Sequence, residues 1–127
     1  MAIDLDTGIT VTGPINPALQ ASSATVNGAA VDLWAAGYRD PRVLLVAGLG
    51  TRTDGSFTFS LEQSDDDSTY VALTPYSGSL AAVAAADTRR TAAYQPTKRY
   101  VRAKSVSTAV TSGAVHHAHV LLVPPSL

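Results

Sequence analysis

Residues 55–73 read GSFTFSLEQSDDDSTYVAL. Phe57, Phe59 and Leu61 alternate with polar residues, the period-two pattern of a strand with one apolar and one solvated face. This pattern places Glu62 on the solvated face. The run SDDDS that follows favours a turn, and a strand-like run resumes at Tyr70. The stretch therefore predicts a β-hairpin with an acidic tip.

Further strands are predicted on both sides of this hairpin. Residues 42–49 contain the run VLLVAGL, whose lack of alternation predicts a central strand covered on both faces. Residues 98–106 alternate again, and residues 113–123, GAVHHAHVLLV, form a last strand before two prolines. About six to eight strands separated by turn signals predict an all-β, single-domain antiparallel β-sandwich or a jelly-roll-like barrel.

The N-terminal part of the chain has a different character. Residues 1–23 are interrupted by glycines and prolines, so they are predicted to form an extended arm, with residues 24–127 as the sandwich domain. The arm carries spaced apolar residues, among them Ile9, Val11 and Ile15. We expect these three to contact a partner, and the arm to become ordered only on assembly.

Three shorter stretches allow more than one interpretation. Asn27-Gly28 favours a tight hairpin and a plain loop about equally. Residues 79–87, SLAAVAAAD, favour a helix through their alanines, although a strand or an extended loop fits nearly as well. Trp34 and Tyr38 are interpreted as core or interface anchors; a sugar-stacking role would need a neighbouring aromatic platform.

Composition excludes several classes of protein. The 127 residues suit one domain, and charged residues are only 15% of them, which suggests that a partner covers part of the surface. The formal net charge of −1 gives no reason to expect a nucleic-acid or membrane partner. There is no cysteine, no apolar run long enough to span a bilayer, and no basic segment in MAIDLDTG that would indicate a signal peptide.

Two clusters resemble metal sites, and neither predicts one. His117 and His119 would share a strand face beside His116, but no third ligand is marked. The favoured interpretation is therefore a strand whose histidine face is partly solvated or faces a neighbouring subunit. In the acidic tip, an EF-hand loop starting at Asp65 would require Gly at position 70 and Glu at position 76. Tyrosine occupies both positions.

Catalytic motifs are missing from the sequence. Glu62 and an aspartate could in principle form the carboxylate pair of a glycosidase, but no nucleophile elbow, phosphate-binding loop or HExxH motif accompanies them. We therefore expect no enzyme activity, no catalytic or metal-binding residues and no cofactor.

Basic residues are concentrated toward the C-terminal half. Residues 89–104 hold six of the nine Lys and Arg residues, interleaved with tyrosines. Arg and Tyr occur in nucleic-acid sites and in protein interfaces; the near-zero net charge favours a protein partner. The predicted contact residues are Arg99, Tyr100, Arg102 and Lys104.

The hairpin, followed by YQPTKRYVRAKSV at residues 94–106, resembles small structural proteins of tailed bacteriophages. The resemblance covers residues 31–106 and departs at residues 94–96, where a glycine is expected near the tyrosine. The matching positions include Glu62, Ser64, Asp65, Asp66, Tyr70, Lys98, Arg99, Tyr100, Val101 and Arg102.

This resemblance implies a non-enzymatic capsid decoration, or cementing, protein. It would bind the major capsid protein on the outside of the phage head, with a homotrimer as the favoured oligomer, and would be located in the virion. The alternatives are a head-tail joining or tail protein, and a carbohydrate-binding or adhesin module. An exposed pair of aromatic residues in a groove would distinguish the carbohydrate-binding module.

Overall fold

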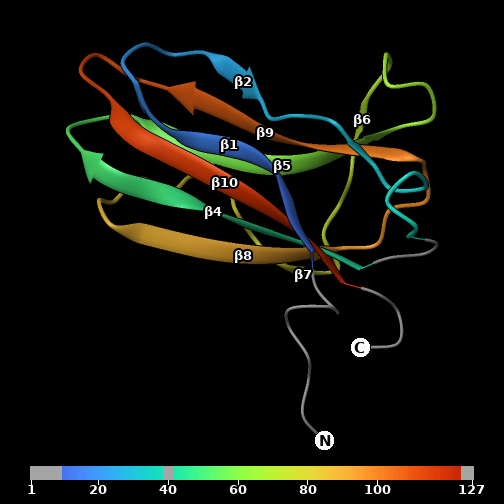
Figure 1. Ribbon diagram of the computed structural model, residues 1–127. Helices are drawn as coiled ribbons and strands as arrows, with labels where there is room; N and C mark the ends of the chain where they lie inside the picture. Colours follow the sequence, from blue (N-terminus) through green and yellow to red (C-terminus); the bar gives the residue numbers. More distant parts are fainter. Residues whose placement is uncertain (1–9, 39–41, 124–127) are drawn as a thin grey trace, which may run out of the picture.

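Two antiparallel β-sheets make up the protein, seen in a computed structural model that describes residues 10–38 and 42–123. The described residues contain strands and no helix (Figure 1). The strands are β1 (Thr10–Gln20), β2 (Thr25–Asn27), β3 (Val31–Asp32), β4 (Arg42–Arg52), β5 (Ser56–Ser64), β6 (Val71–Ala72), β7 (Ser77–Gly78), β8 (Thr88–Tyr94), β9 (Tyr100–Thr108) and β10 (Ala114–Val123). The predicted all-β sandwich is confirmed.

Sheet A has the strand order β1-β10-β4-β8-β7, so β4 is central as predicted. Val43 and Leu45 point inward and are fully buried. Leu44 and Val46, which alternate with them, are only half-buried on the outer face. The prediction that both faces of this strand are covered is therefore wrong for the outer face.

Sheet B has the order β2-β9-β5-β6, with β3 also paired to β9. β5 and β6 pair antiparallel, with Glu62 opposite Ala72, which confirms the predicted hairpin. β9 pairs with β5 from Ser56–Thr108 to Ser64–Tyr100, so these two strands form the centre of the sheet.

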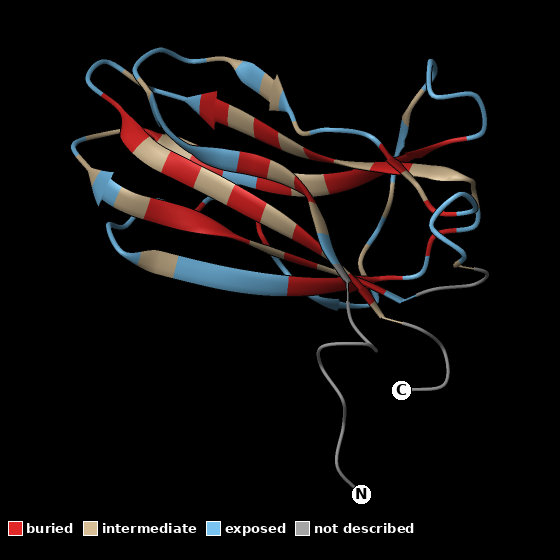
Figure 2. Cartoon of the chain, viewed as in Figure 1, coloured by how far each residue is buried: buried red, intermediate tan, exposed pale blue. Residues whose placement is uncertain are grey.

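The core lies between the two sheets. Phe57, Phe59 and Leu61 of β5 are buried there, as their alternation predicts. Figure 2 shows the same alternation along β10, where buried and half-buried residues follow one another, while much of β8 is exposed. Tyr94, at the end of β8, is among the largest fully buried side chains.

The predicted arm over residues 1–23 is corrected in its second half. Residues Thr10–Gln20 form β1, which pairs antiparallel with β10 and is therefore part of sheet A. The register shifts at two places along β1, where its glycine and prolines interrupt the ladder. Residues 1–9 lie outside the described part of the chain.

The alanine-rich segment, residues 79–87, adopts turns and a bridge instead of a helix. Phe57 and Val83 exchange backbone hydrogen bonds of 2.9 and 2.7 Å, and the Phe59 amide donates to the Leu80 carbonyl. The segment thus covers the edge of β5 that β6 leaves open. No helix in the described residues is long and apolar enough to cross a bilayer.

Asn27-Gly28 forms a connection and not a tight hairpin. β2 and β3 both pair antiparallel with β9, so they run in the same direction along one neighbour. The Gly28 amide donates to the Ala103 carbonyl at 2.7 Å, which continues the contact with β9 between the two short strands. Of the two interpretations of this dipeptide, the loop is correct.

Candidate binding surface

Two of the predicted basic contact residues lie on the outer face of sheet B, where they bind a carboxylate. Arg102 Nε and Lys104 Nζ lie 2.9 and 3.5 Å from the two carboxylate oxygens of Glu62. Glu62 stands opposite Arg102 in the β5–β9 register and is only 6% exposed. The prediction of a solvated Glu62 is wrong, because cross-strand cations cover the carboxylate.

Arg99 forms a second ion pair at the start of β9. Its Nε and Nη2 donate to the two carboxylate oxygens of Asp32 at 2.9 and 2.7 Å, a bidentate geometry. These hydrogen bonds from Arg99 are the main reason that the pKa of Asp32 falls to about 2. The pair fixes the guanidinium in one orientation.

The fixed guanidinium lies between two aromatic rings. Its central carbon is 5.5 Å from the ring centroid of Trp34 and 5.1 Å from that of Tyr100, within the range of a cation–π contact. Trp34 is nevertheless 49% exposed. We call Asp32, Trp34, Arg99 and Tyr100 the Trp34 platform.

A similar arrangement holds Tyr70 beside the platform. The guanidinium carbon of Arg102 lies 3.9 Å from the centroid of the Tyr70 ring, and the Tyr70 hydroxyl donates to the Asp67 carboxylate. Burial, together with the hydrogen bond to Asp67, raises the pKa of Tyr70. Arg102 therefore connects β9 to both Glu62 and the acidic tip.

The acidic tip is an ordered turn. The Asp66 carboxylate accepts hydrogen bonds from the Thr69 and Ser68 amides and from the Ser64 hydroxyl, each at 2.9 Å. These bonds, that of Thr69 foremost, lower the pKa of Asp66 to about 2. Asp65 makes a 2.8 Å ion pair with Lys98. Asp66 therefore acts as the cap of the turn and not as a free surface charge.

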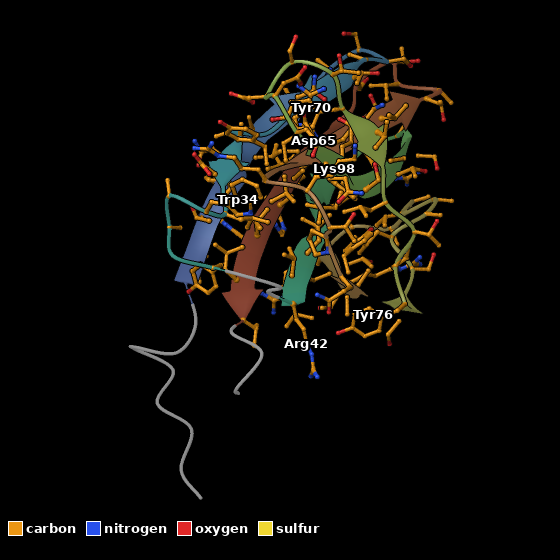
Figure 3. All side chains as sticks on the ribbon, turned by 90° about the vertical axis from the view of Figure 1, so that its right-hand side faces the viewer. Trp34, Arg42, Asp65, Tyr70, Tyr76 and Lys98 are labelled. Atoms are coloured by element: carbon orange, nitrogen blue, oxygen red, sulfur yellow. The ribbon has the colours of Figure 1, made fainter. Side chains whose placement is uncertain are left out.

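Several loops meet at one end of the sandwich. Figure 3 views this end directly and shows Trp34, Tyr70 and Lys98 there, with Tyr76 apart from them. Tyr76 is 59% exposed. The described residues form no pocket, so two exposed aromatic residues are present at this end without a groove.

The three predicted N-terminal contact residues have different positions. Ile9 lies outside the described residues. Val11 is 61% exposed on β1, opposite Leu121 of β10. Ile15 is only 5% exposed and packs in the core of its own chain. Its predicted role as a partner contact is therefore corrected to a core residue.

The three histidines divide between two environments. His116 is buried between the sheets, with Nδ1 3.0 Å from the Ser105 hydroxyl and its ring 5.7 Å from that of Phe57. His117 and His119 share the outer face of sheet A, with ring centroids 6.2 Å apart. Within residues 10–38 and 42–123, no group of three metal-ligating side chains occurs.

Burial lowers the pKa of His116, and its neighbour His117 lowers it further. Burial also lowers the pKa of His117, with additional effects from His119 and Arg89. Both imidazoles therefore favour their neutral forms in the folded chain.

Sequence reasoning identified the cations of this surface but missed their carboxylates. Asp32 is not among the predicted contact residues, and Glu62 is predicted to lie on the solvated face. The signal that could have identified Glu62 is the register of two alternating strands, which places an acid on β5 opposite the bases on β9. No comparable signal links Asp32 to Arg99, because they are 67 positions apart.

Comparison with known proteins gives little further guidance. No protein-family model matches the chain. No curated protein matches it either. Among solved structures, the chain is similar to the CBM22-1 xylan-binding domain of Paenibacillus barcinonensis Xyn10C, at 14% identity and a TM-score of 0.45, over 92% of this chain and 86% of that one. At this level of similarity, the ligand of that domain says nothing about the ligand of this chain.

Proposed function

We propose that this protein is a non-catalytic binding module that attaches to a macromolecule through the Trp34 platform. The observation that carries the proposal is a Trp side chain 49% exposed beside a guanidinium that a bidentate carboxylate holds in place. Trp, Tyr and Arg are the residues that contribute most to binding energy in interfaces. A platform already ordered in the free protein loses less entropy on binding.

A polysaccharide chain is the ligand class that suits this platform. The C–H faces of sugar rings can stack on the Trp34 ring, while hydroxyl groups at the ring edge can bond with Asp32 and Arg99. The exposed Tyr76 offers a second aromatic surface at the same end (Figure 3). An open surface is better suited to an extended chain than to a small molecule, which normally needs a pocket.

Binding to a glycan array, followed by titration of each hit, tests this proposal. We expect Trp34→Ala to weaken binding by about tenfold or more, as for an aromatic hot spot. Leu19→Ala is the control, because Leu19 is an exposed apolar residue on the other sheet, at 63% against 49% for Trp34. Failure of the wild-type protein to bind any glycan, or unchanged binding by a folded Trp34→Ala variant, would contradict the polysaccharide proposal.

The second candidate is a phage-head decoration protein, found in the virion on the major capsid protein and favouring a homotrimer. It is supported by the resemblance over residues 31–106 and by an apolar outer face on sheet A, described below. The test is stoichiometric recovery of the protein on purified heads; recovery on tails would favour the head-tail or tail alternative.

Charge reversal then tests the predicted β9 docking surface. Lys104→Glu is a better variant than Arg102→Glu, because Arg102 also holds Glu62 and Tyr70 and its loss would disturb the fold. Lys104 makes only a 3.5 Å contact with Glu62. Full occupancy of heads by a folded Lys104→Glu variant would place the docking surface elsewhere.

A further inference from the structure

The outer face of sheet A carries apolar side chains where solvent-facing strands normally carry polar ones. The strand registers place Val11 opposite Leu121, and Leu121 opposite Leu44, so one apolar row crosses β1, β10 and β4. Val11 is 61% exposed, and the two leucines are half-buried. An antiparallel sheet with one solvated face is expected to alternate apolar and polar residues. An apolar patch that breaks this rule marks an interaction site.

The same face carries an arginine and two histidines and, on its described strands, no acid. Within their described bounds, none of the strands of sheet A contains Asp or Glu. Arg89 of β8 and His117 of β10 lie on either side of Gly48, and His119 lies beside Val46. Arg89 is exposed and makes no ion pair with any described residue.

We propose that this outer face, which we call the sheet A face (Leu44, Val46, Arg89, His117, His119 and Leu121), docks a protein partner. The partner surface would present carboxylates to Arg89 and the two imidazoles, and apolar side chains to the apolar row that crosses β1, β10 and β4. Such a partner complements the face in charge around an apolar centre. In interfaces, burial of the apolar centre gives affinity and the surrounding charges fix the orientation. The sheet A face belongs to the opposite layer from the Trp34 platform, so it does not depend on the ligand of that platform.

A second copy of this chain is a poorer occupant. In a two-fold dimer each patch meets itself, so Arg89 and the imidazoles of one copy would face those of the other. With no carboxylate on these strands, such a contact would leave Arg89 without an oppositely charged partner. Nucleic acid is also a poorer occupant, because phosphates would pair with Arg89 but leave the leucine row uncovered.

The test uses the isotope-labelled full chain and three polymer probes, with binding mapped by amide chemical shifts. The probes are a glutamate–tyrosine copolymer, polyglutamate and a DNA duplex. We expect the copolymer to shift amides of β4 and β10, and to bind about three times more tightly than polyglutamate, because it also covers the apolar row.

Two arginines provide a matched pair of variants. Arg89→Glu should weaken copolymer binding about tenfold, because it adds repulsion to the lost attraction. Arg90→Glu makes the same change in net charge, but Arg90 stands opposite Ala47 and donates to the Ala81 carbonyl at 3.1 Å, away from the sheet A face. Its copolymer binding should stay within about twofold of wild type.

Val46→Thr separates the apolar contribution from the charge. Threonine keeps the branched shape and strand preference of valine at this half-buried position. The variant should weaken binding of the copolymer by about twofold and leave polyglutamate binding unchanged.

Acidification gives an independent readout. Burial lowers the pKa of His117, so this imidazole gains its positive charge only below the ordinary histidine pKa of about 6.5. Copolymer binding should therefore tighten between about pH 6 and about pH 5, where most glutamate side chains stay ionised. The groups facing His117 are His119 on the same strand and Arg89 from β8. β4 contributes Gly48 and Val46, which do not titrate, and β1 contains no titratable residue.

The proposal is overturned by any of four results. These are shifts confined to sheet B, equal losses for Arg89→Glu and Arg90→Glu, tighter binding of DNA than of the copolymer at this face, or a stable oligomer that Arg89→Glu dissociates. A stable oligomer would assign the face to a second copy, and tight DNA binding would assign it to nucleic acid.

Discussion

The two outer faces of the sandwich differ in whether their charged side chains form ion pairs. On sheet B, Arg102 and Lys104 share Glu62, and Arg99 binds Asp32 in a bidentate pair. On sheet A, Arg89 has no carboxylate partner among the described residues, and it lies opposite Gly48 on the outer face that also carries Leu44 and Val46. Charges paired within the chain orient aromatic side chains, whereas an unpaired charge on an apolar face remains available to a partner. The two faces are therefore assigned different tasks.

The largest effect on stability is expected within sheet A, at Gly48. A Cβ built there would lie 2.1 Å from the Thr88 carbonyl oxygen and 2.8 Å from the Arg89 Cα, both backbone atoms. Gly48→Ala should therefore force β8 away from β4 and cost about 2–3 kcal/mol in the free energy of unfolding. Denaturant titration measures this cost.

Gly50→Ala is the control for this prediction. A Cβ at Gly50 would meet only Val115, at 3.8 Å, which is an ordinary contact. Equal destabilisation by the two variants would show that the close approach of β8 at Gly48 is not the cause.

A smaller effect compares the two faces directly. Glu62→Gln should cost about 1–2 kcal/mol, because it removes the charge that Arg102 and Lys104 share at a buried position. Arg89→Gln should change stability by less than about 0.5 kcal/mol, because Arg89 is exposed and forms no ion pair with the residues that the structure describes. Both are measured by the same denaturant titration. A cost for Arg89→Gln as large as that for Glu62→Gln would remove the distinction between the faces.

The smallest expected effect is the pH dependence of stability. The pH range in which stability is lost differs between the histidines of sheet A and the aspartates on the sheet B side. His116 has a lowered pKa in the folded state, so the unfolded chain takes up its proton first as pH falls. Stability should therefore decline as pH falls below the ordinary histidine pKa of about 6.5, with His117 contributing in the same range. Asp32 and Asp66 have pKa values lowered to about 2, so their contribution is lost only below the ordinary aspartate pKa of about 4.

Melting temperatures from pH 7.5 to pH 3 would resolve the two ranges. His116→Asn should flatten most of the decline between pH 7 and pH 5 and leave the lower range unchanged. A decline of unchanged size in that variant would assign the upper range to another group.

Sequence alone determined several of the strands and, where apolar and polar residues alternate, which residues share a face. The alternation of Phe57, Phe59 and Leu61 predicted β5 and its buried side, because the side-chain period of a strand is two. The absence of alternation in residues 42–49 identified the central strand. The same absence could not say which face of β4 would be covered, because both of its faces are apolar and a period-two pattern needs contrast.

Tertiary structure decided the contacts between residues far apart in the chain. Ile15 reached the core because β1 paired with β10, more than ninety positions later, despite the glycine and prolines that predicted an arm. Arg99 met Asp32 because β3 and β9 are neighbours. Such pairings follow from which strands lie side by side, and local patterns carry no information about that choice. For the same reason, only the structure revealed that Arg102 and Lys104 of β9 pair with Glu62, whereas Arg89 pairs with no carboxylate in residues 10–38 and 42–123.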